Sequence, residues 1–199
     1  MSTASLQVLG VVGSQNKESV TRVVMTALIE KLRAARCTVD VFDYLHEPLP
    51  LFNTDTSYAA QGYAALQARV EQADVFILGT PDYHGSISSA MKSFLDHFWR
   101  EFAGKLFGTV VASHEKGLTV TDHLRTVARQ CYAWSMPYGV SFAEGEEVKE
   151  GRIVDERFTG RLEMFARDLR IYGEVLARQR RADIEGSEPG FLARHRKTV

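Results

Sequence analysis

Residues 73–86 read Ala73-Asp74-Val75-Phe76-Ile77-Leu78-Gly79-Thr80-Pro81-Asp82-Tyr83-His84-Gly85-Ser86, and they decide the fold. The first eight are largely apolar and are followed by turn-forming residues, which predicts a buried strand over 73–80. Residues 88–99 place Met91, Phe94 and Phe98 at helical spacing, with Ser88 as a plausible cap. The loop over 81–86 therefore leads from the carboxyl end of a strand into a helix. Open α/β sheets bind their ligands at such loops.

The loop over 81–86 suits a flat ligand. Gly85 has no Cβ, so a ring can approach the backbone closely, and Tyr83 and His84 offer flat rings of their own. Backbone N–H groups without a strand partner can donate to carbonyl oxygens and ring nitrogens. We interpret Asp82 as shaping the turn through a local hydrogen bond rather than as a catalytic carboxylate. His84 is either a ligand contact or an exposed turn residue.

Strand and helix patterns alternate along the chain. Strands are expected at 6–13, 38–43, 73–80, 107–112 and 139–142, and helices at 20–35, 59–72, 88–99, 121–135 and 158–181. Such alternation predicts an α/β fold with right-handed crossovers, a five-stranded parallel sheet in the order 2-1-3-4-5 and helices in layers on both faces. We expect a single domain over 1–179. Residues 180–199 are expected to form a basic, solvated tail, with a partner-binding arm as the alternative.

Composition fits one soluble domain. The 199 residues are 45% hydrophobic and 25% charged, with a formal net charge of −1, which suggests neither nucleic acid nor a membrane surface as a partner. No apolar run approaches the ~20 residues of a membrane span, and no signal peptide is evident, so we expect a cytoplasmic protein. Cys37 and Cys131 lack CxxC spacing and are expected to be packing residues. Without CxxC, HxxxH or HExxH spacing, no metal site is predicted.

A second ligand loop is expected over 13–21, after the first strand. In the predicted order the first and third strands are neighbours, so the loops that follow them should line one crevice. The loop brings hydroxyls and an amide to a helix N-terminus, whose free N–H groups and partial positive charge favour a phosphate. It matches neither the Walker A pattern nor GxGxxG. Taken alone, Ser14 or Ser19 can equally be read as a simple helix cap.

Together the two loops resemble those of the NADPH-dependent FMN reductase family. Ser14-x-Asn16-x-x-Ser19-x-Thr21 is similar to the family's S-x-R-x-x-S-x-N phosphate loop, and Pro81-Asp82-Tyr83-His84-Gly85-Ser86 is similar to its P-E-Y-N/H-G-S loop. Residues 88–96 resemble the family's S-G-A-L-K-N-A-L-D helix. The resemblance covers residues 6–176 in the correct order.

The resemblance implies a flavodoxin-like fold that binds FMN. Residues implied at the phosphate are Ser14, Asn16, Ser19, Val20 and Thr21; those at the ring edge are Pro81, Asp82, Tyr83, His84, Gly85 and Ser86; those of a third loop are Ser113, His114 and Gly117. It implies no catalytic side chain, because the chemistry takes place at N5 of the flavin. NADPH would deliver a hydride there, and a small second acceptor (a quinone, a flavin or similar) would then receive the electrons on the same ring face, by a ping-pong mechanism.

The sequence departs from the family pattern in two loops. Asn16 stands where the family has Arg, which removes a bidentate charged contact, and Lys17 is positioned to compensate. The third loop, residues 113–118, keeps only Gly117 of the family's glycine-rich turn. His114 and Lys116 are there either as ligand contacts or as solvated side chains.

The resemblance also implies a homodimer or homotetramer in which Trp99 and Phe102 roof the partner's site. Two other functions are alternatives. A flavodoxin-type electron carrier is disfavoured, since such carriers are usually acidic and have T-x-T-G-x-T in the first loop. A regulatory module with a vestigial flavin site is suggested by Asn16 and the altered third loop. The acceptor and the choice of NADPH or NADH stay open, and residues 44–58 either roof the acceptor site or merely cover the sheet edge.

Overall fold

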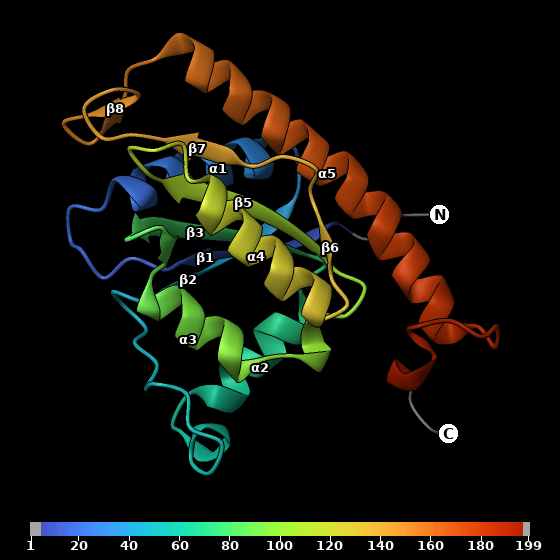
Figure 1. The fold of residues 1–199 in the computed structure, drawn as a ribbon. Helices are drawn as coiled ribbons and strands as arrows, with labels where there is room; N and C mark the ends of the chain where they lie inside the picture. Colours follow the sequence, from blue (N-terminus) through green and yellow to red (C-terminus); the bar gives the residue numbers. More distant parts are fainter. Residues whose placement is uncertain (1–4, 197–199) are drawn as a thin grey trace.

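A computed structural model of the protein describes residues 5–196. Its centre is a parallel sheet with α1 and α5 packed on one face and α2, α3 and α4 on the other (Figure 1). The predicted three-layer α/β/α architecture is confirmed. The helices are α1 (Val20–Ala34), α2 (Tyr63–Gln72), α3 (Ser89–His97), α4 (Leu118–Gln130) and α5 (Glu156–Glu185), with short 3₁₀ turns at Ser57–Ala59, Arg100–Phe102 and Ala193–His195.

The sheet is doubly wound. Its order is β2-β1-β3-β5, and both β6 and β7 pair with β5. Both faces of the sheet are covered, which explains why β1 and the first part of β3 are continuous apolar runs rather than alternating ones. The strands are β1 (Gln7–Val12), β2 (Thr38–Asp43), β3 (Val75–Tyr83), β4 (Ser86–Ile87), β5 (Leu106–Ala112), β6 (Trp134–Ser135) and β7 (Val140–Phe142), with a separate hairpin of β8 (Val148–Lys149) and β9 (Arg152–Ile153).

The prediction of five strands is wrong in number, because the sheet of residues 5–196 has seven. The predicted order 2-1-3-4-5 holds for β2, β1, β3, β5 and β7. The edge beyond β5 is divided: β6 pairs with its first residues and β7 with its last three. Pro137 lies between the two pieces, and a proline, which has no N–H to donate, interrupts a ladder.

The end of β3 also differs from the prediction. Pro81 to Tyr83 continue the strand instead of forming a turn, and β4 folds back antiparallel, pairing Asp82 with Ile87. His84 (φ 57°) and Gly85 (φ 75°) form a two-residue turn between them. Two successive positive φ values are typical of the tight turns that match the twist of a hairpin. The hairpin fixes the loop rigidly at the carboxyl end of β3.

Several predicted helix ends are wrong, those of α2 and α4 among them. The helix predicted over 59–72 begins only at Tyr63, after Gly62 with φ 85°. The helix predicted over 121–135 begins at Leu118, because Gly117 takes a left-handed conformation that leads into it, and ends at Gln130. At its far end Tyr132 has φ 57° and turns the chain into β6. Ser88 caps α3 as predicted, accepting from the N–H of Met91 at 3.1 Å.

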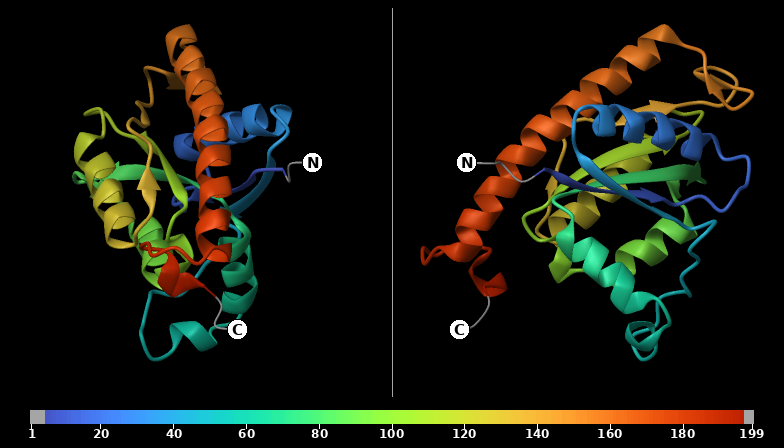
Figure 2. Two further views of the ribbon diagram at one scale, coloured as in Figure 1. Left: turned by 90° about the vertical axis from the view of Figure 1, so that its right-hand side faces the viewer. Right: turned by 180° about the vertical axis from the view of Figure 1, so that it is seen from behind.

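Beyond residue 180 the chain continues as helix and then packs in part on the domain, although most of residues 181–191 are exposed. Helix α5 runs to Glu185 along the whole molecule, and the chain then folds back beside its last turns (Figure 2). Leu192 is only 2% exposed and packs against Gly104. Arg180 donates to the carbonyl oxygen of Ala103 at 2.8 Å, and Arg196 donates to that of Asp183 at 3.0 Å. The apolar side chain and the backbone acceptors hold residues 186–196 on the domain.

Cys37 and Cys131 are both free and buried, as expected of packing residues. Burial raises the pKa of the Cys131 thiol to about 11, which keeps it protonated and unreactive near neutral pH. In the part of the chain that the structure describes, no helix combines the length and apolar character needed to span a bilayer.

Candidate functional site

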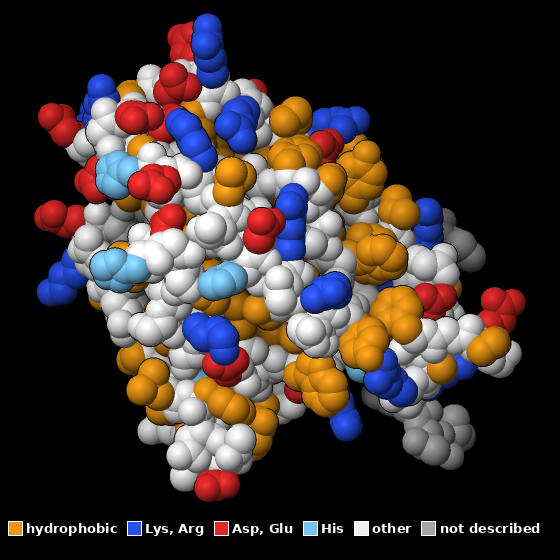
Figure 3. Space-filling model, in the orientation of Figure 1, with side chains coloured by type: hydrophobic (Ala, Val, Ile, Leu, Met, Phe, Trp, Pro, Cys, Tyr) orange, Lys and Arg blue, Asp and Glu red, His pale blue; other side chains and the backbone are white. Residues whose placement is uncertain are grey.

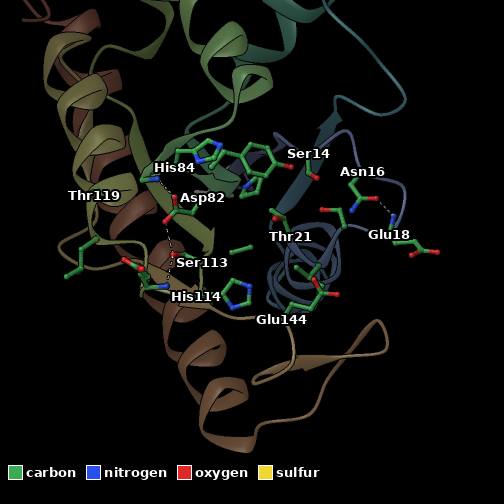
Figure 4. A pocket seen from close by; sticks show the side chains of 18 residues that line it. Ser14, Asn16, Glu18, Thr21, Asp82, His84, Ser113, His114, Thr119 and Glu144 are labelled. Carbon is green, nitrogen blue, oxygen red and sulfur yellow. Dashed lines mark hydrogen bonds between the residues drawn. The ribbon is translucent and has the colours of Figure 1, made fainter.

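A cavity of about 800 Å³ opens at the carboxyl ends of β1, β3 and β5 (Figure 4). It lies between the loops over 13–21, 81–86 and 113–118, as expected for neighbouring strands on the two sides of a topological switch point. Of the residues singled out from the sequence, it is lined by Ser14, Asn16, Ser19, Val20, Thr21, Pro81, Asp82, Tyr83, His84, Gly85, Ser113 and His114.

Ser86 and Gly117 were singled out but do not line the cavity. Ser86 begins β4, and its hydroxyl lies 3.3 Å from Nδ1 of His123 on α4. Gly117 has φ 60° and packs so closely on Val111 that a Cβ would lie 2.6 Å from that side chain. Its role is to let the third loop enter α4, and it places Leu118 and Thr119 at the cavity instead.

The first loop brings the N-terminus of α1 to the cavity. Ser19 caps the helix, because its hydroxyl accepts from the N–H of Arg22 at 3.3 Å, and the predicted capping role is confirmed. The same residue also lines the cavity. Asn16 accepts from the N–H of Glu18 at 3.0 Å and thereby stabilises the loop. The first N–H groups of a helix have no acceptor within it, so this end of the cavity is rich in donors.

Arg22 supports the same loop from outside the cavity. Its guanidinium donates to the carbonyl oxygens of Ser14 and Asn16 at 2.9 and 2.7 Å, and it forms an ion pair with Asp43 at 2.6 Å. No motif in the sequence singles out Arg22. Its position in the first turn of the expected helix, facing the end of the second strand, is the signal that could have indicated it.

Asp82 joins the second loop to the third. One carboxylate oxygen accepts from the N–H of Gly85 at 2.8 Å, which confirms the predicted role of Asp82 in shaping the turn. The other accepts from the hydroxyl of Ser113 at 2.7 Å. Ser113 in turn accepts from the N–H of Glu115 at 3.1 Å. The aromatic side chains of Tyr83 and the exposed His84 stand on a loop that these bonds hold in place.

The charged residues that line the cavity are acidic. Glu18, Asp82, Glu115 and Glu144 contribute carboxylates, and within residues 5–196 no lysine or arginine lines it. Lys17 and Lys116 lie close in sequence but outside the lining, and Lys116 lies 4.0 Å from Glu146. Figure 3 shows acidic side chains gathered at the upper left, near β7 and β8, with histidines among them. Any phosphate here must therefore be bound by hydroxyl and N–H donors.

Several lining residues were not identified from the sequence: Glu18, Ala112, Glu115, Leu118, Thr119 and Glu144. Leu118 and Thr119 were missed because the helix was predicted to begin at 121. Glu144 follows β7, and the rule that ligands bind at carboxyl ends of strands would have indicated it. Among the described residues, no group of three or more His, Cys, Asp and Glu side chains is arranged as a metal site.

One of the two residues expected to roof a partner's site is not available for that role. Phe102 is fully buried (0% exposed) against Phe76 and Phe107, so the expectation is wrong for it. Trp99 is 52% exposed, and its indole N–H donates to the carbonyl oxygen of Gln130 at the end of α4. Its role at a partner's site stays a prediction. Residues 44–58 do not line the cavity.

The cavity fits a flavin mononucleotide. Its phosphate end has a helix N-terminus and hydroxyls, which are good donors to an anion. The space beside Gly85 is open. A Cβ added there would meet one neighbouring atom within 4 Å, the hydroxyl oxygen of Thr119 at 3.6 Å. A ring can therefore lie close to the backbone of the β3–β4 turn.

The doubly wound sheet and a ligand cavity at its switch point define a flavodoxin-like α/β protein. The structure is similar to an apo NADH:FMN oxidoreductase, with a TM-score of 0.70 and 17% identity over 84% of this chain and 90% of that one. It is also similar to a flavodoxin from Streptococcus pneumonia TIGR4, with a TM-score of 0.57 and 19% identity over 85% of this chain and 99% of that one. These likenesses confirm the predicted fold.

The sequence profile described as NADPH-dependent FMN reductase matches residues 6–147, and the chain belongs to this family. A curated relative, the FMN-dependent NADPH-azoreductase of Staphylococcus aureus (strain USA300), is 24% identical over 147 residues, covering 70% of this chain and 78% of the relative. The protein is accordingly an FMN-dependent oxidoreductase with NAD(P)H as its co-substrate.

Proposed function

We propose that the protein transfers electrons from NAD(P)H to a small planar acceptor, such as a quinone, a free flavin or an azo compound, and that the two substrates bind in turn. When bound, FMN supplies the hydride and electron chemistry, so no side chain has to act as acid, base or nucleophile. The observation that carries the proposal is the single cavity that joins the α1 N-terminus to the β3–β4 turn.

The residues have distinct tasks in this proposal. Ser14, Ser19 and Thr21 donate from hydroxyls, and the first N–H groups of α1 donate from the backbone, toward the phosphate of FMN. The turn at His84 and Gly85 would bring its backbone beside the ring, although the N–H of Gly85 already donates to Asp82. Asp82 keeps that turn fixed through its bonds to Gly85 and Ser113. One site used in turn by both substrates gives ping-pong kinetics.

The wide cavity supports the exchange of substrates. About 800 Å³ is a volume typical of sites for drug-sized ligands. Tyr83 is 54% exposed at its edge, so its ring is available to a second flat molecule. The name of the staphylococcal relative makes azo compounds one class of acceptor to test.

The first test is an absorbance titration of the purified protein with FMN, followed by NADPH or NADH without oxygen. We expect the spectrum of bound oxidised flavin and its rapid bleaching by one of the two nucleotides, with recovery when a quinone is added. Bound flavin that neither nucleotide bleaches would instead indicate an electron carrier. Absence of FMN binding would leave a regulatory module and would contradict the proposal.

We also propose that the protein is a homodimer or homotetramer. Exposed apolar side chains on the outer surface, among them Trp134, Tyr172 and Val175, support this because such residues are unfavourable in contact with water. Light scattering on the eluted protein gives its mass directly, and a monomer at micromolar concentration would refute this part.

A further inference from the structure

Arg22 has every hydrogen-bond donor of its guanidinium in use. Nε and Nη2 donate to the two carboxylate oxygens of Asp43 at 2.6 and 3.0 Å. Nη2 also donates to the carbonyl oxygen of Ser14 at 2.9 Å. Nη1 donates to the carbonyl oxygens of Asn16 at 2.7 Å and Lys17 at 3.5 Å. Because a guanidinium has five N–H groups, these five contacts leave none free for a ligand.

The contacts of Arg22 determine how the first loop faces the cavity. Ser14 and Asn16 line the cavity, whereas Arg22 and Asp43 do not, so the bonded carbonyl oxygens are directed at a group outside it. A carbonyl oxygen aimed at a phosphate would repel it. In a trans peptide the following N–H points the opposite way from the carbonyl oxygen. The N–H groups of Gln15 and Lys17, which lie between and beside the lining residues Ser14, Asn16 and Glu18 without lining the cavity themselves, are therefore directed away from the guanidinium.

The charge of Arg22 is balanced locally. The side chain of Asp43 is only 12% exposed, and its paired carboxylate neutralises the guanidinium. Asp43 is the last residue of β2 and also accepts from the N–H of Leu45 at 2.9 Å, so the pair is anchored to the sheet. The pair thus contributes the shape of the loop rather than positive charge to the cavity.

We propose that Arg22, held by Asp43, is a positioning residue that makes the site select a phosphorylated flavin over one without a phosphate. No lysine or arginine of residues 5–196 lines the cavity, so recognition of the phosphate depends on the direction of N–H and hydroxyl donors. Arg22 sets that direction by holding three carbonyl oxygens on the other side of the loop. The proposal rests on the proposed function, because it takes the phosphate of FMN to lie at this loop.

The test compares the affinities of FMN and riboflavin, which differ only in the phosphate, for wild type, Arg22→Gln and Arg22→Lys. We expect Arg22→Gln to weaken FMN binding about tenfold or more, as loss of an orienting partner does at other sites, and to change riboflavin binding less than about twofold. Arg22→Lys keeps the charge but not the fork of donors, so it should restore little of the preference.

Arg69→Gln is the matched control. Arg69 likewise pairs with a carboxylate at the β2 edge, with Nε 2.7 Å from Asp40, and with Glu47 at 2.7 Å, but it does not line the cavity or contact the first loop. Its loss should leave the ratio of FMN to riboflavin affinity unchanged. Asp43→Asn removes the carboxylate that holds Arg22, so it tests the same role if Arg22→Gln does not fold. It should also reduce the ratio of FMN to riboflavin affinity.

The outcomes separate this inference from the proposed function. If wild type binds neither flavin, the proposed function fails and the inference fails with it. If wild type binds FMN and Arg22→Gln binds it equally well, or loses both flavins in equal proportion, the positioning role alone is refuted. If Arg22→Lys restores the full preference for FMN, charge rather than the fork of donors is responsible, and the inference is again refuted.

Discussion

The carboxylate of Asp82 accepts a hydrogen bond of 2.7 Å from the hydroxyl of Ser113, and this bond joins two loops that are separated by α3 and β5. Each residue also bonds within its own loop, to the N–H of Gly85 and of Glu115 respectively. The ring end of the cavity is therefore one hydrogen-bonded unit, and its stability and its ligand binding should change together.

Asp82→Ala should destabilise the fold by about 1–3 kcal/mol, since donors of Gly85 and Ser113 lose a charged acceptor. FMN affinity should fall with it. Ser113→Ala removes only one of the two bonds and should cost less. Urea unfolding and FMN titration of both variants check this, and an Asp82→Ala protein as stable as wild type would refute the role of the carboxylate.

Gly85→Val should abolish FMN binding while the fold survives. At φ 75° a β-branched side chain is strained by at least about 1–2 kcal/mol, and it would also cover the backbone that the ring approaches. Gly62→Val is the matched control, because Gly62 has φ 85° and open space around it but lies outside the cavity. Both variants should lose similar thermal stability, and only Gly85→Val should lose the flavin spectrum. Retained binding would place the ring elsewhere.

Asp43 should give the fold a stabilising contribution that is lost in acid. Burial raises the pKa of its carboxyl, but the hydrogen bond from Arg22 and other favourable contacts outweigh burial and lower the pKa below 3.8. A carboxyl whose pKa is lowered in the folded state stabilises the protein at pH values above its pKa in the unfolded chain, about 3.9. This stabilisation is lost as the pH falls through the lower pKa of the folded state. The difference in unfolding free energy between wild type and Asp43→Asn should be constant above about pH 5 and shrink below pH 4. A difference independent of pH would show that the pair is not ionic.

The contribution of Lys105 to the free energy of unfolding should increase with pH above neutrality. The residue is only 2% exposed, and its Nζ donates to the carbonyl oxygens of Val70 and Glu71 at 2.7 and 2.8 Å. Burial is the main cause that lowers its pKa to about 7. The unfolded chain then binds more protons than the folded one between pH 7 and about 10.5, so the contribution of Lys105 to stability increases with pH there, by at most about 1.4 kcal/mol per pH unit.

Lys105→Met provides the comparison for this prediction. The variant lacks the titrating group, so the unfolding free energy of wild type minus that of Lys105→Met should increase from pH 7 to pH 10. A flat difference across this range would show that the lysine is charged throughout and that water reaches it.

The parts of the fold that follow from local pattern were predictable. The buried run at 75–78, the Ser88 cap and the helix over 20–34 depend on residues close in sequence, and the order of the main strands follows from general rules of βαβ crossovers. Pairing between distant residues was not predictable in the same way. The division of the edge strand into β6 and β7 and the burial of Leu192 depend on contacts with β5 and Gly104 that no local pattern specifies.

The candidate site likewise has a part that could be predicted from the sequence and a part that could not. The loops over 13–21 and 81–86 contribute most of the expected lining, because neighbouring strands place their following loops together. Arg22 was missed because its importance comes from carbonyl oxygens and from Asp43 on another strand. Gly117 was expected at the ligand because of its likeness to the family's glycine-rich turn, yet its close neighbour is Val111.

The neutral character of the donors at the phosphate end has a practical consequence. Dissolved ions screen attraction between separated charges, with a range of about 10 Å at 0.1 M salt, but they weaken short, directed hydrogen bonds far less. Since no lysine or arginine of residues 5–196 lines the cavity, the cofactor should stay bound in concentrated salt solutions that strip ligands from arginine-rich sites. Purification at high ionic strength would then yield a yellow protein.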